Sequence, residues 1–268
     1  MRQRIKNFLK KVPGLRFLKT KCYEPMRKGY FRYYFLYLRK DKPEDIERLT
    51  SFGITDIKPM NFTQWRIGKG KDNAYRRYYT GVFQGTKCFI KIGKNDATVK
   101  NELEILRHKE MDKVTFSPKL LVGTDSFAEK TVMLAVEYMD DLKPFHTVNT
   151  EADFQEACRQ FVNILDGLEK AEIVHGDIHK GNLALCKGNV LLLDYGISKI
   201  FNKENAINYL HRPGTFYRET AGTRVYDDAY SFVKMVEKMA LPAEYLDNPY
   251  MQEIKNRVDK FVFHVTVS

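Results

Sequence analysis

The stretch that decides the fold of this chain is His175-Gly176-Asp177-Ile178-His179-Lys180-Gly181-Asn182, and Asp194-Tyr195-Gly196 follows it. Between them, short apolar runs around Leu183–Leu185 and Val190–Leu193 predict two strands that form a hairpin. The sequence therefore predicts a polar loop, a hairpin and a second polar turn. An ordinary surface loop followed by an unrelated acidic turn is the alternative that His-Gly-Asp alone leaves open.

Taken together, these residues resemble the catalytic loop and the metal-binding motif of protein-kinase-like enzymes. In that family, an Asp lies at the acceptor hydroxyl and an Asn five residues later reaches a metal ion. A second Asp, brought alongside by the hairpin, holds the Mg²⁺ that bridges the phosphates. The resemblance implies that Asp177 is the catalytic base, that Asn182 and Asp194 bind metal, and that ATP and Mg²⁺ are the cofactors. His179 would then contact the transferred phosphate or the acceptor.

Upstream of this loop, the apolar pattern predicts a β-hairpin and then a helix. Residues 78–83 and 88–92 have the composition of two strands, and Gln84-Gly85-Thr86-Lys87 is typical of the turn between them. Residues 96–109 place Val99, Leu103 and Leu106 on one helical face. The sequence therefore predicts a hairpin followed by a helix on the N-terminal side of the loop.

This hairpin and helix carry a lysine and two glutamates that fit the same resemblance. Lys91 matches the family's strand lysine, which contacts the α- and β-phosphates of ATP. Glu102 and Glu104 lie on different faces of the predicted helix, so only one of them can pair with Lys91. The family's Glu-x-x-Ile-Leu spacing favours Glu102.

Two further segments are predicted to contact the nucleotide. Gly68-Lys69-Gly70 lies where the family has its glycine-rich loop, so Gly68 and Gly70 would let backbone N–H groups approach phosphate. Asn73 stands in the place of the third glycine, and an ordinary surface turn is the alternative. Glu137-Tyr138-Met139 resembles the hinge, so the backbone of Glu137 and Met139 is expected along the adenine edge.

The order of predicted elements is a β-hairpin, a helix, strands, a long helix, the polar loop, the short hairpin and a last helix. A strand is expected from Thr131 to Met139, the long helix over 151–171 and the last helix from Tyr226 to Met239. The resemblance, which covers roughly residues 65–240, implies an α+β, bilobal protein-kinase-like fold. It would have a β-rich N-lobe, a helical C-lobe and a shortened C-terminal region.

This order of elements suggests two domains along the chain. Residues 1–60 are expected to form a basic N-terminal extension, and residues 61–268 a kinase-like domain. Within the second, the N-lobe is expected at about 61–139 and the C-lobe at about 140–268.

The positive charge of the chain is concentrated at its N-terminus. Residues 1–40 contain thirteen Lys and Arg residues but one acid, Glu24, which gives them a net charge of +12. Because the whole chain has a net charge of +11, residues 41–268 carry −1. The body of the protein therefore lacks the basic character of a nucleic-acid groove, and no nucleic-acid partner is expected.

The first part of the extension has the pattern of an amphipathic helix. Ile5, Phe8, Leu9 and Val12 fall on one helical stripe, with basic residues mostly off it. Such a helix can lie on an anionic membrane surface, although the same stripe could instead pack on the domain. We therefore expect contact with an anionic membrane surface.

Neither a membrane-spanning segment nor a signal peptide is expected. The most apolar early run is far shorter than the roughly 20 residues that a bilayer requires, and no small-residue cleavage site follows the N-terminal segment. The four cysteines lack the paired spacing of a zinc site or a disulfide framework. These features together predict a cytoplasmic protein that is peripheral on the inner face of the cytoplasmic membrane.

Three departures from the protein-kinase pattern narrow the resemblance to one branch. Gly176 replaces the Arg that commonly precedes the catalytic Asp, and His179 replaces the Lys that contacts phosphate. Asp228, which matches the buried Asp that opens the central helix of the C-lobe, is followed by only 40 residues. With the basic extension, the chain most resembles the lipopolysaccharide core heptose kinase family. That resemblance implies a heptose hydroxyl as acceptor, and the lipopolysaccharide core or another anionic glycolipid as partner.

Two other functions remain open from the sequence. Pro213-Gly214-Thr215 and the residues after it resemble the end of a protein-kinase activation segment, which favours a protein serine/threonine kinase. A nucleotide-binding pseudokinase scaffold is the second alternative. It is disfavoured because Lys91, Asp177, Asn182 and Asp194 are all present.

Overall fold

The structure is a computed structural model that describes residues 43–60, 75–201, 216–220 and 222–266. The chain divides into two compact units, Met1–Ser51 and Phe52–Ser268. The described part of the first unit is helix α4 (Pro43–Ser51). All of the predicted catalytic residues belong to the second unit.

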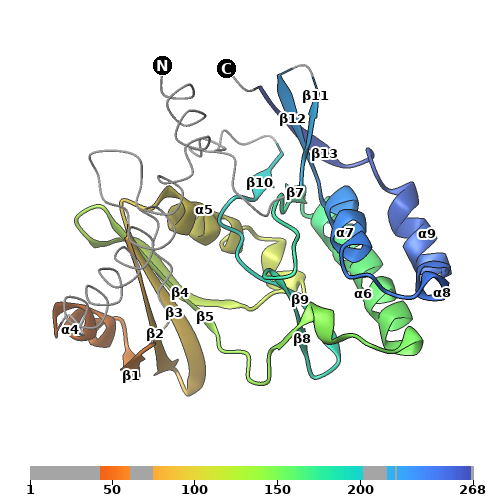
Figure 1. Ribbon diagram of the computed structural model, residues 1–268. Coiled ribbons are helices and arrows are strands. Elements are labelled where there is room, and N and C mark those ends of the chain that lie inside the picture. Colours follow the sequence, from red (N-terminus) through yellow and green to blue (C-terminus); the bar gives the residue numbers. More distant parts are fainter. Residues whose placement is uncertain (1–42, 61–74, 202–215, 221, 267–268) are drawn as a thin grey trace, which may run out of the picture. The chain divides into compact units, whose positions relative to one another are not determined.

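A five-stranded antiparallel sheet begins the second unit, in the order β1-β2-β3-β5-β4 (Figure 1). Its strands are β1 (Ile54–Pro59), β2 (Tyr75–Phe83), β3 (Thr86–Lys94), β4 (Leu120–Ala128) and β5 (Thr131–Glu137). The predicted hairpin is confirmed as β2–β3, and the predicted strand from Thr131 is confirmed as β5. The edge strand β1 lies before residue 61, and β4 was not predicted.

The turn between β2 and β3 follows directly from its sequence. Phe83 pairs with Thr86, which leaves Gln84 and Gly85 as a two-residue loop. Both have positive φ angles, 48° and 79°. Two-residue hairpins prefer this left-handed geometry because it matches the twist of the strands, and Gly adopts it without steric cost.

Helix α5 (Ala97–Leu106) connects β3 to the rest of the sheet. The Asp96 side chain caps its first turn by accepting from the backbone N–H groups of Thr98 and Val99. The helix was predicted to continue to residue 109, which is wrong. It ends at Leu106, because the chain then turns so that Met111 becomes buried in the core.

Helix α6 (Glu151–Lys170) confirms the predicted long helix. Thr150 caps it by accepting from the backbone N–H of Asp153. Every residue of its predicted apolar face is buried: Phe154, Ala157, Cys158, Phe161, Ile164, Leu165 and Leu168. Phe161 stacks on Phe232 of α7 (Asp228–Glu237) with ring centroids 3.9 Å apart, so this face joins α6 to the core.

Short strands surround the polar loop that follows α6. They are β6 (Lys143–Pro144), β7 (Ile173–Val174), β8 (Leu183–Cys186), β9 (Asn189–Leu192) and β10 (Lys199–Ile200). The β8–β9 pair is the predicted short hairpin, and this prediction is confirmed. β7 pairs with β10, and this pairing brings together the two ends of the segment that contains the polar loop, the hairpin and the turn after it.

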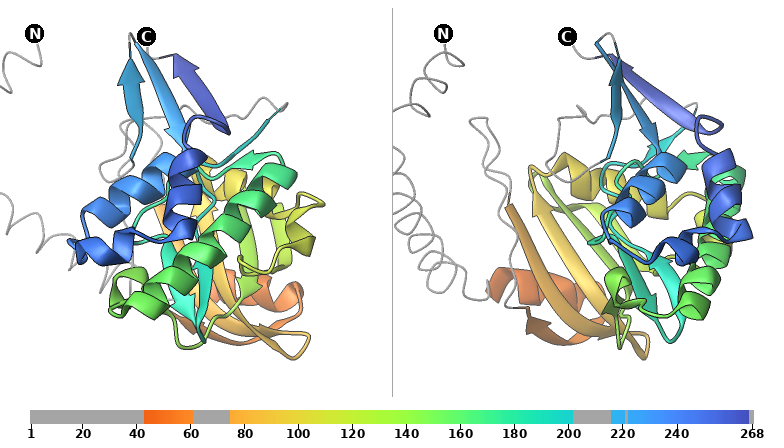
Figure 2. Two further views of the ribbon diagram at one scale, coloured as in Figure 1. Left: turned by 90° about the vertical axis from the view of Figure 1, so that its right-hand side faces the viewer. Right: turned by 45° about the vertical axis from the view of Figure 1, so that its right-hand side comes forward.

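The C-terminal part of the chain contains helices and a sheet that the sequence pattern did not predict. Two short helices, α8 (Ala243–Leu246) and α9 (Pro249–Asn256), follow α7, and a three-stranded sheet consists of β11 (Arg218–Thr220), β12 (Thr223–Asp227) and β13 (Val262–Thr266). Both views of Figure 2 show α6, α7 and α9 packed together beside this sheet. The last helix was predicted to begin at Tyr226, but Tyr226 and Asp227 complete β12 by pairing with β13.

These elements give the α+β class that the sequence predicts, with a β-rich first part and a helical second part. One apolar core joins the parts, since its buried residues come from α5, β5, α6, β9 and α7. Of the helices in the described ranges, none combines the length and the apolar composition that a bilayer crossing requires.

Candidate active site

The polar loop after β7 is anchored by a buried carboxylate from α7. Asp228 accepts hydrogen bonds from the backbone N–H groups of His175 (2.7 Å) and Gly176 (2.8 Å). Burial raises the pKa of Asp228 to about 7, and the two N–H donors act against that rise. The loop is therefore held at its first two residues by a side chain more than fifty positions later in the sequence.

The backbone conformation at position 176 favours glycine. Gly176 has a φ of +73°, and a Cβ atom there would lie 3.4 Å from the ring of Phe263 in β13. Any larger side chain would be strained in this left-handed conformation. The replacement of the usual Arg by Gly, noted from the sequence, thus has a local structural reason.

His175 connects the loop to the strand that precedes Asp194. One ring nitrogen, Nε2, lies 3.1 Å from the carbonyl oxygen of Leu193, and the other, Nδ1, accepts from the backbone N–H of Asp177. Because burial lowers the pKa of His175 to about 4, the ring is neutral near pH 7 and donates from Nε2. His175 therefore acts as a structural connector and not as a proton carrier.

Asp177, His179 and Asn182 are brought together by the turn of the loop. The Asn182 side-chain N–H donates to the Asp177 carbonyl oxygen at 3.0 Å. The His179 Nδ1 accepts from the backbone N–H of Gly181 at 2.9 Å, which leaves the proton on Nε2, and this atom lies 3.7 Å from Asp177 Oδ1. The arrangement presents a carboxylate, an imidazole N–H and an amide oxygen in one small region.

Asp194 lies beside Lys91. The Asp194 carboxylate is 3.6 Å from the Lys91 ammonium, which forms a buried ion pair with Glu102 at 2.5 Å. Burial alone would lower the pKa of Lys91, but the carboxylates of Asp194 and Glu102 outweigh it and raise that pKa, so Lys91 is charged. Glu104 is exposed, so Glu102 and not Glu104 is the glutamate that pairs with Lys91.

Asn101 and Ser198 link α5 to the Asp-Tyr-Gly turn, although neither residue belongs to a motif in the sequence. The Asn101 side-chain N–H donates to the carbonyl oxygens of Tyr195 (3.2 Å) and Ser198 (2.9 Å). The Ser198 hydroxyl donates to the His175 carbonyl oxygen at 3.1 Å. A polar Asn on the buried side of a predicted helix was the one signal that could have identified this contact.

The predicted nucleotide-binding segments are described in part. The backbone N–H groups of Glu137 and Tyr138 donate to the carbonyl oxygens of Lys119 and Lys87, so they are already used within the protein. A base along this segment would instead use other backbone groups, such as those of Met139. Gly68 and Gly70 lie outside the described residues, as do the amphipathic stripe from Ile5 and the Pro213-Gly214-Thr215 segment.

The charges around Lys91 favour a divalent cation at Asp194. Lys91 and Arg76 are the cations of this cluster, while Glu102, Asp96 and Asp194 are its carboxylates. Burial raises the pKa of the Glu102 carboxyl, although the Lys91 ammonium acts against that rise. Asp194 is the most exposed member of the cluster at 29%, against 8% or less for the others, so its carboxylate is the one that faces solvent.

The available donors match the preferences of Mg²⁺. A carboxylate of Asp194 and the amide oxygen of Asn182 are oxygen ligands, and Mg²⁺ characteristically completes its shell with water and substrate phosphates. Asp194 and Asn182 are thus the residues that would hold such an ion.

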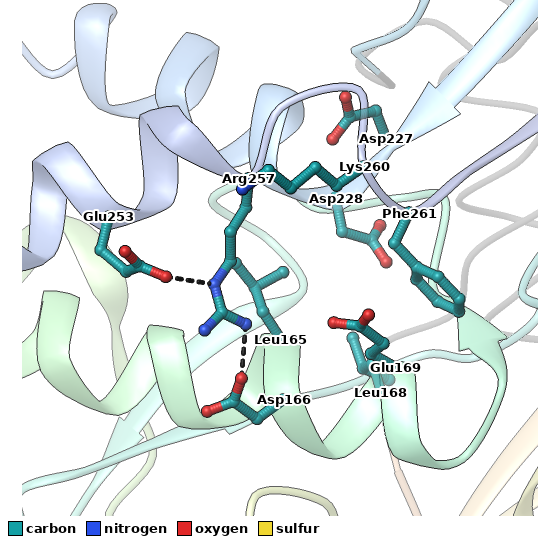
Figure 3. A pocket seen from close by; sticks show the side chains of 11 residues that line it. Leu165, Asp166, Leu168, Glu169, Asp227, Asp228, Glu253, Arg257, Lys260 and Phe261 are labelled. Atoms are coloured by element: carbon teal, nitrogen blue, oxygen red, sulfur yellow. Dashed lines mark hydrogen bonds and ion pairs between the residues drawn. The ribbon is translucent and has the colours of Figure 1, made fainter.

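A cavity of about 230 Å³ lies between α6, α7 and α9, away from these groups (Figure 3). Its wall includes Arg257, which pairs with Asp166 (2.5 Å) and Glu253 (2.9 Å). Lys91, Asp177 and Asp194 do not line it. Asp228 forms part of this wall and also holds the polar loop after β7.

The described residues have a protein-kinase-like fold. A five-stranded antiparallel sheet carries a lysine that pairs with a helix glutamate, and a polar loop with its Asp-Tyr-Gly turn lies against the same helix. An aspartate at the start of a later helix holds the loop.

Comparison with protein-family models and with curated proteins finds no match. Among solved structures, the chain is similar to the kinase PK-1 of Cydia pomonella granulovirus, at 20% sequence identity and a TM-score of 0.42. The similarity covers 59% of this chain and 58% of the viral chain, so this chain matches a little over half of the viral protein's length.

Proposed function

We propose that this chain is a phosphotransferase that uses ATP and Mg²⁺ to phosphorylate an alcohol group. The observation that carries the proposal is the position of Asp194, 3.6 Å from a buried lysine that is itself paired with Glu102. A cation and a metal-binding carboxylate so close together suit the binding of polyphosphate with its metal. A pseudokinase scaffold is disfavoured, because Lys91, Asp177, Asn182 and Asp194 are all kept.

Each residue has a role that follows from its chemistry. Lys91 neutralises charge on the phosphates, and the oxygens of Asp194 and Asn182 would hold Mg²⁺. Bound ATP would supply the phosphoryl group. Asp177 orients the acceptor hydroxyl and takes its proton as the new O–P bond forms and the bond from the γ-phosphorus to the ADP oxygen breaks. The Nε2–H of His179 faces the Asp177 carboxylate and is suited to donate to the phosphate or the acceptor.

We propose a sugar of the lipopolysaccharide core, a heptose, as the acceptor. The resemblance of the His-Gly-Asp-x-His-x-Gly-Asn loop to that family supports it, as does the basic extension, which suits an anionic glycolipid.

The purified protein is expected to phosphorylate a heptose-containing lipopolysaccharide core faster than casein or a basic protein. The assay uses labelled ATP with core oligosaccharide and a protein mixture in one reaction, followed by separation of the two acceptor classes. The Asp177→Asn variant serves as the inactive control. Label on protein Ser or Thr, with none in the oligosaccharide, would reject the sugar acceptor and favour a protein kinase.

We also propose a cytoplasmic location, peripheral on the inner face of the cytoplasmic membrane. Deleting residues 1–40 is expected to abolish binding to anionic vesicles, because each basic side chain near such a surface contributes on the order of 1 kcal/mol. Co-sedimentation with phosphatidylserine-containing vesicles measures this, and neutral vesicles are the control. A full-length protein that ignores anionic vesicles at low salt would show that the extension has another role.

A further inference from the structure

Arg76, on β2, is a buried arginine that the mechanism above does not use. It is 2% exposed, and its partner in the β2–β3 register is Gly93, two residues from Lys91. Side chains two residues apart on a strand share a face. Arg76 and Lys91 therefore point to the same side of the sheet, towards the start of α5.

The guanidinium of Arg76 binds the first turn of α5 at two points. It donates to both carboxylate oxygens of Asp96 and to the hydroxyl of Thr98. Thr98 in turn donates its hydroxyl proton to Asp96 at 2.7 Å, so the three side chains form a closed set. Burial would raise the pKa of Asp96, but the Arg76 charge outweighs it and lowers that pKa. The pair is ionised, and the fork of the guanidinium fixes its geometry.

Thr98 connects these three side chains to the Lys91–Glu102 pair and to the turn that carries Asp194. It lies four residues before Glu102, so the two side chains share one face of the helix, and Glu102 reaches Lys91 from there. On its other side, Thr98 is in close contact with the turn that carries Asp194. A Cβ atom at Gly196 would lie 3.2 Å from the Thr98 Cβ and 3.0 Å from the Asp194 Oδ1.

We infer that Arg76 is a positioning residue for phosphoryl transfer, which sets the start of α5 so that Glu102 stays on Lys91 and Asp194 stays beside it. The role rests on the proposed function, since it places groups that act on Mg²⁺-ATP. Arg76 does not itself touch the reacting atoms. It acts through Asp96 and Thr98.

Arg76→Lys is the informative change, because it keeps the positive charge but loses the fork that reaches Asp96 and Thr98 together. Phosphoryl transfer is expected to fall by about tenfold or more. In a Glu102→Gln background, the same change should cost less than about threefold, because the two residues act through one arrangement and their effects are not additive. Arg159→Lys, which alters an exposed ion pair with Glu156 on α6, is the matched control and should leave the rate unchanged.

Hydrogen exchange followed by mass spectrometry provides a readout that does not depend on activity. In Arg76→Lys, amides in the first two turns of α5 are expected to exchange about tenfold or more faster, while those of α6 keep their rates. Thr98→Val removes the hydroxyl with little change of shape and is expected to give the same exchange pattern. It replaces Arg76→Lys as the test if the arginine variant does not fold.

The outcomes separate the inference from the proposed function. Unchanged α5 exchange in the Arg76 and Thr98 variants, or a rate loss that simply adds to that of Glu102→Gln, would overturn the positioning role. If the wild type transfers no phosphate to any acceptor or to water, while α5 exchange still depends on Arg76, the proposed function fails and Arg76 remains the residue that holds α5.

Discussion

Asp177→Asn is expected to lower the rate of phosphoryl transfer by about a thousandfold, because a positioned general base contributes roughly 10²- to 10⁴-fold. The amide keeps the size of the side chain but cannot accept the acceptor's proton. The backbone of the loop should be unchanged, because its anchors are Asp228 and the neutral His175. Nucleotide affinity is therefore expected to change less than about threefold.

The measurement compares single-turnover transfer with equilibrium binding of ATP in the presence of Mg²⁺. Asp112→Asn, which changes an exposed carboxylate in the turn after α5, is the matched control and should behave as the wild type. Turnover near the wild-type value in the Asp177 variant would remove the proposed base from the mechanism.

The second large effect is expected from Asp194→Asn. This change removes the carboxylate charge beside Lys91 and one of the two proposed metal ligands, so both metal binding and catalysis should suffer. We expect kcat/KM for Mg²⁺-ATP to fall by about a hundredfold or more. The Mg²⁺ concentration that supports half-maximal rate should also rise.

Metal binding separates this variant from the first one. With Mn²⁺ as a spectroscopic probe in the presence of ATP, Asp194→Asn should bind the ion weakly, and Asp177→Asn should bind it as the wild type does. Equal Mn²⁺ affinity in the wild type and in Asp194→Asn would contradict the assignment of Asp194 as a ligand.

The parts of the fold that the sequence predicted are those set by neighbouring residues. The β2–β3 hairpin follows from its Gln-Gly turn, and α6 follows from an apolar stripe that the structure buries completely. The predicted ends of α5 and α7 were wrong by two or three residues. In both cases tertiary contacts decided the boundary, through the burial of Met111 after α5 and the pairing of Tyr226 with Phe263 before α7.

For the candidate site, the order and spacing of motifs indicated its main groups. Asp177 and Asn182 are close because one short loop contains both. Asp194 returns to the same place because a hairpin separates it from them. Because these three residues lie within one short segment, their spacing along the sequence is enough to predict that they come close together.

Other members of the site come from distant parts of the chain, and only the folded structure identifies them. The resemblance to kinase motifs implied a glutamate on the next helix as the partner of Lys91, but the packing of α5 decided that Glu102 is buried and Glu104 exposed. Arg76 and Asn101 gave no motif, because their function is to hold backbone and side chains that become neighbours on folding. Hydrogen bonds and ion pairs of this kind depend on where whole elements pack, and no local spacing encodes that position.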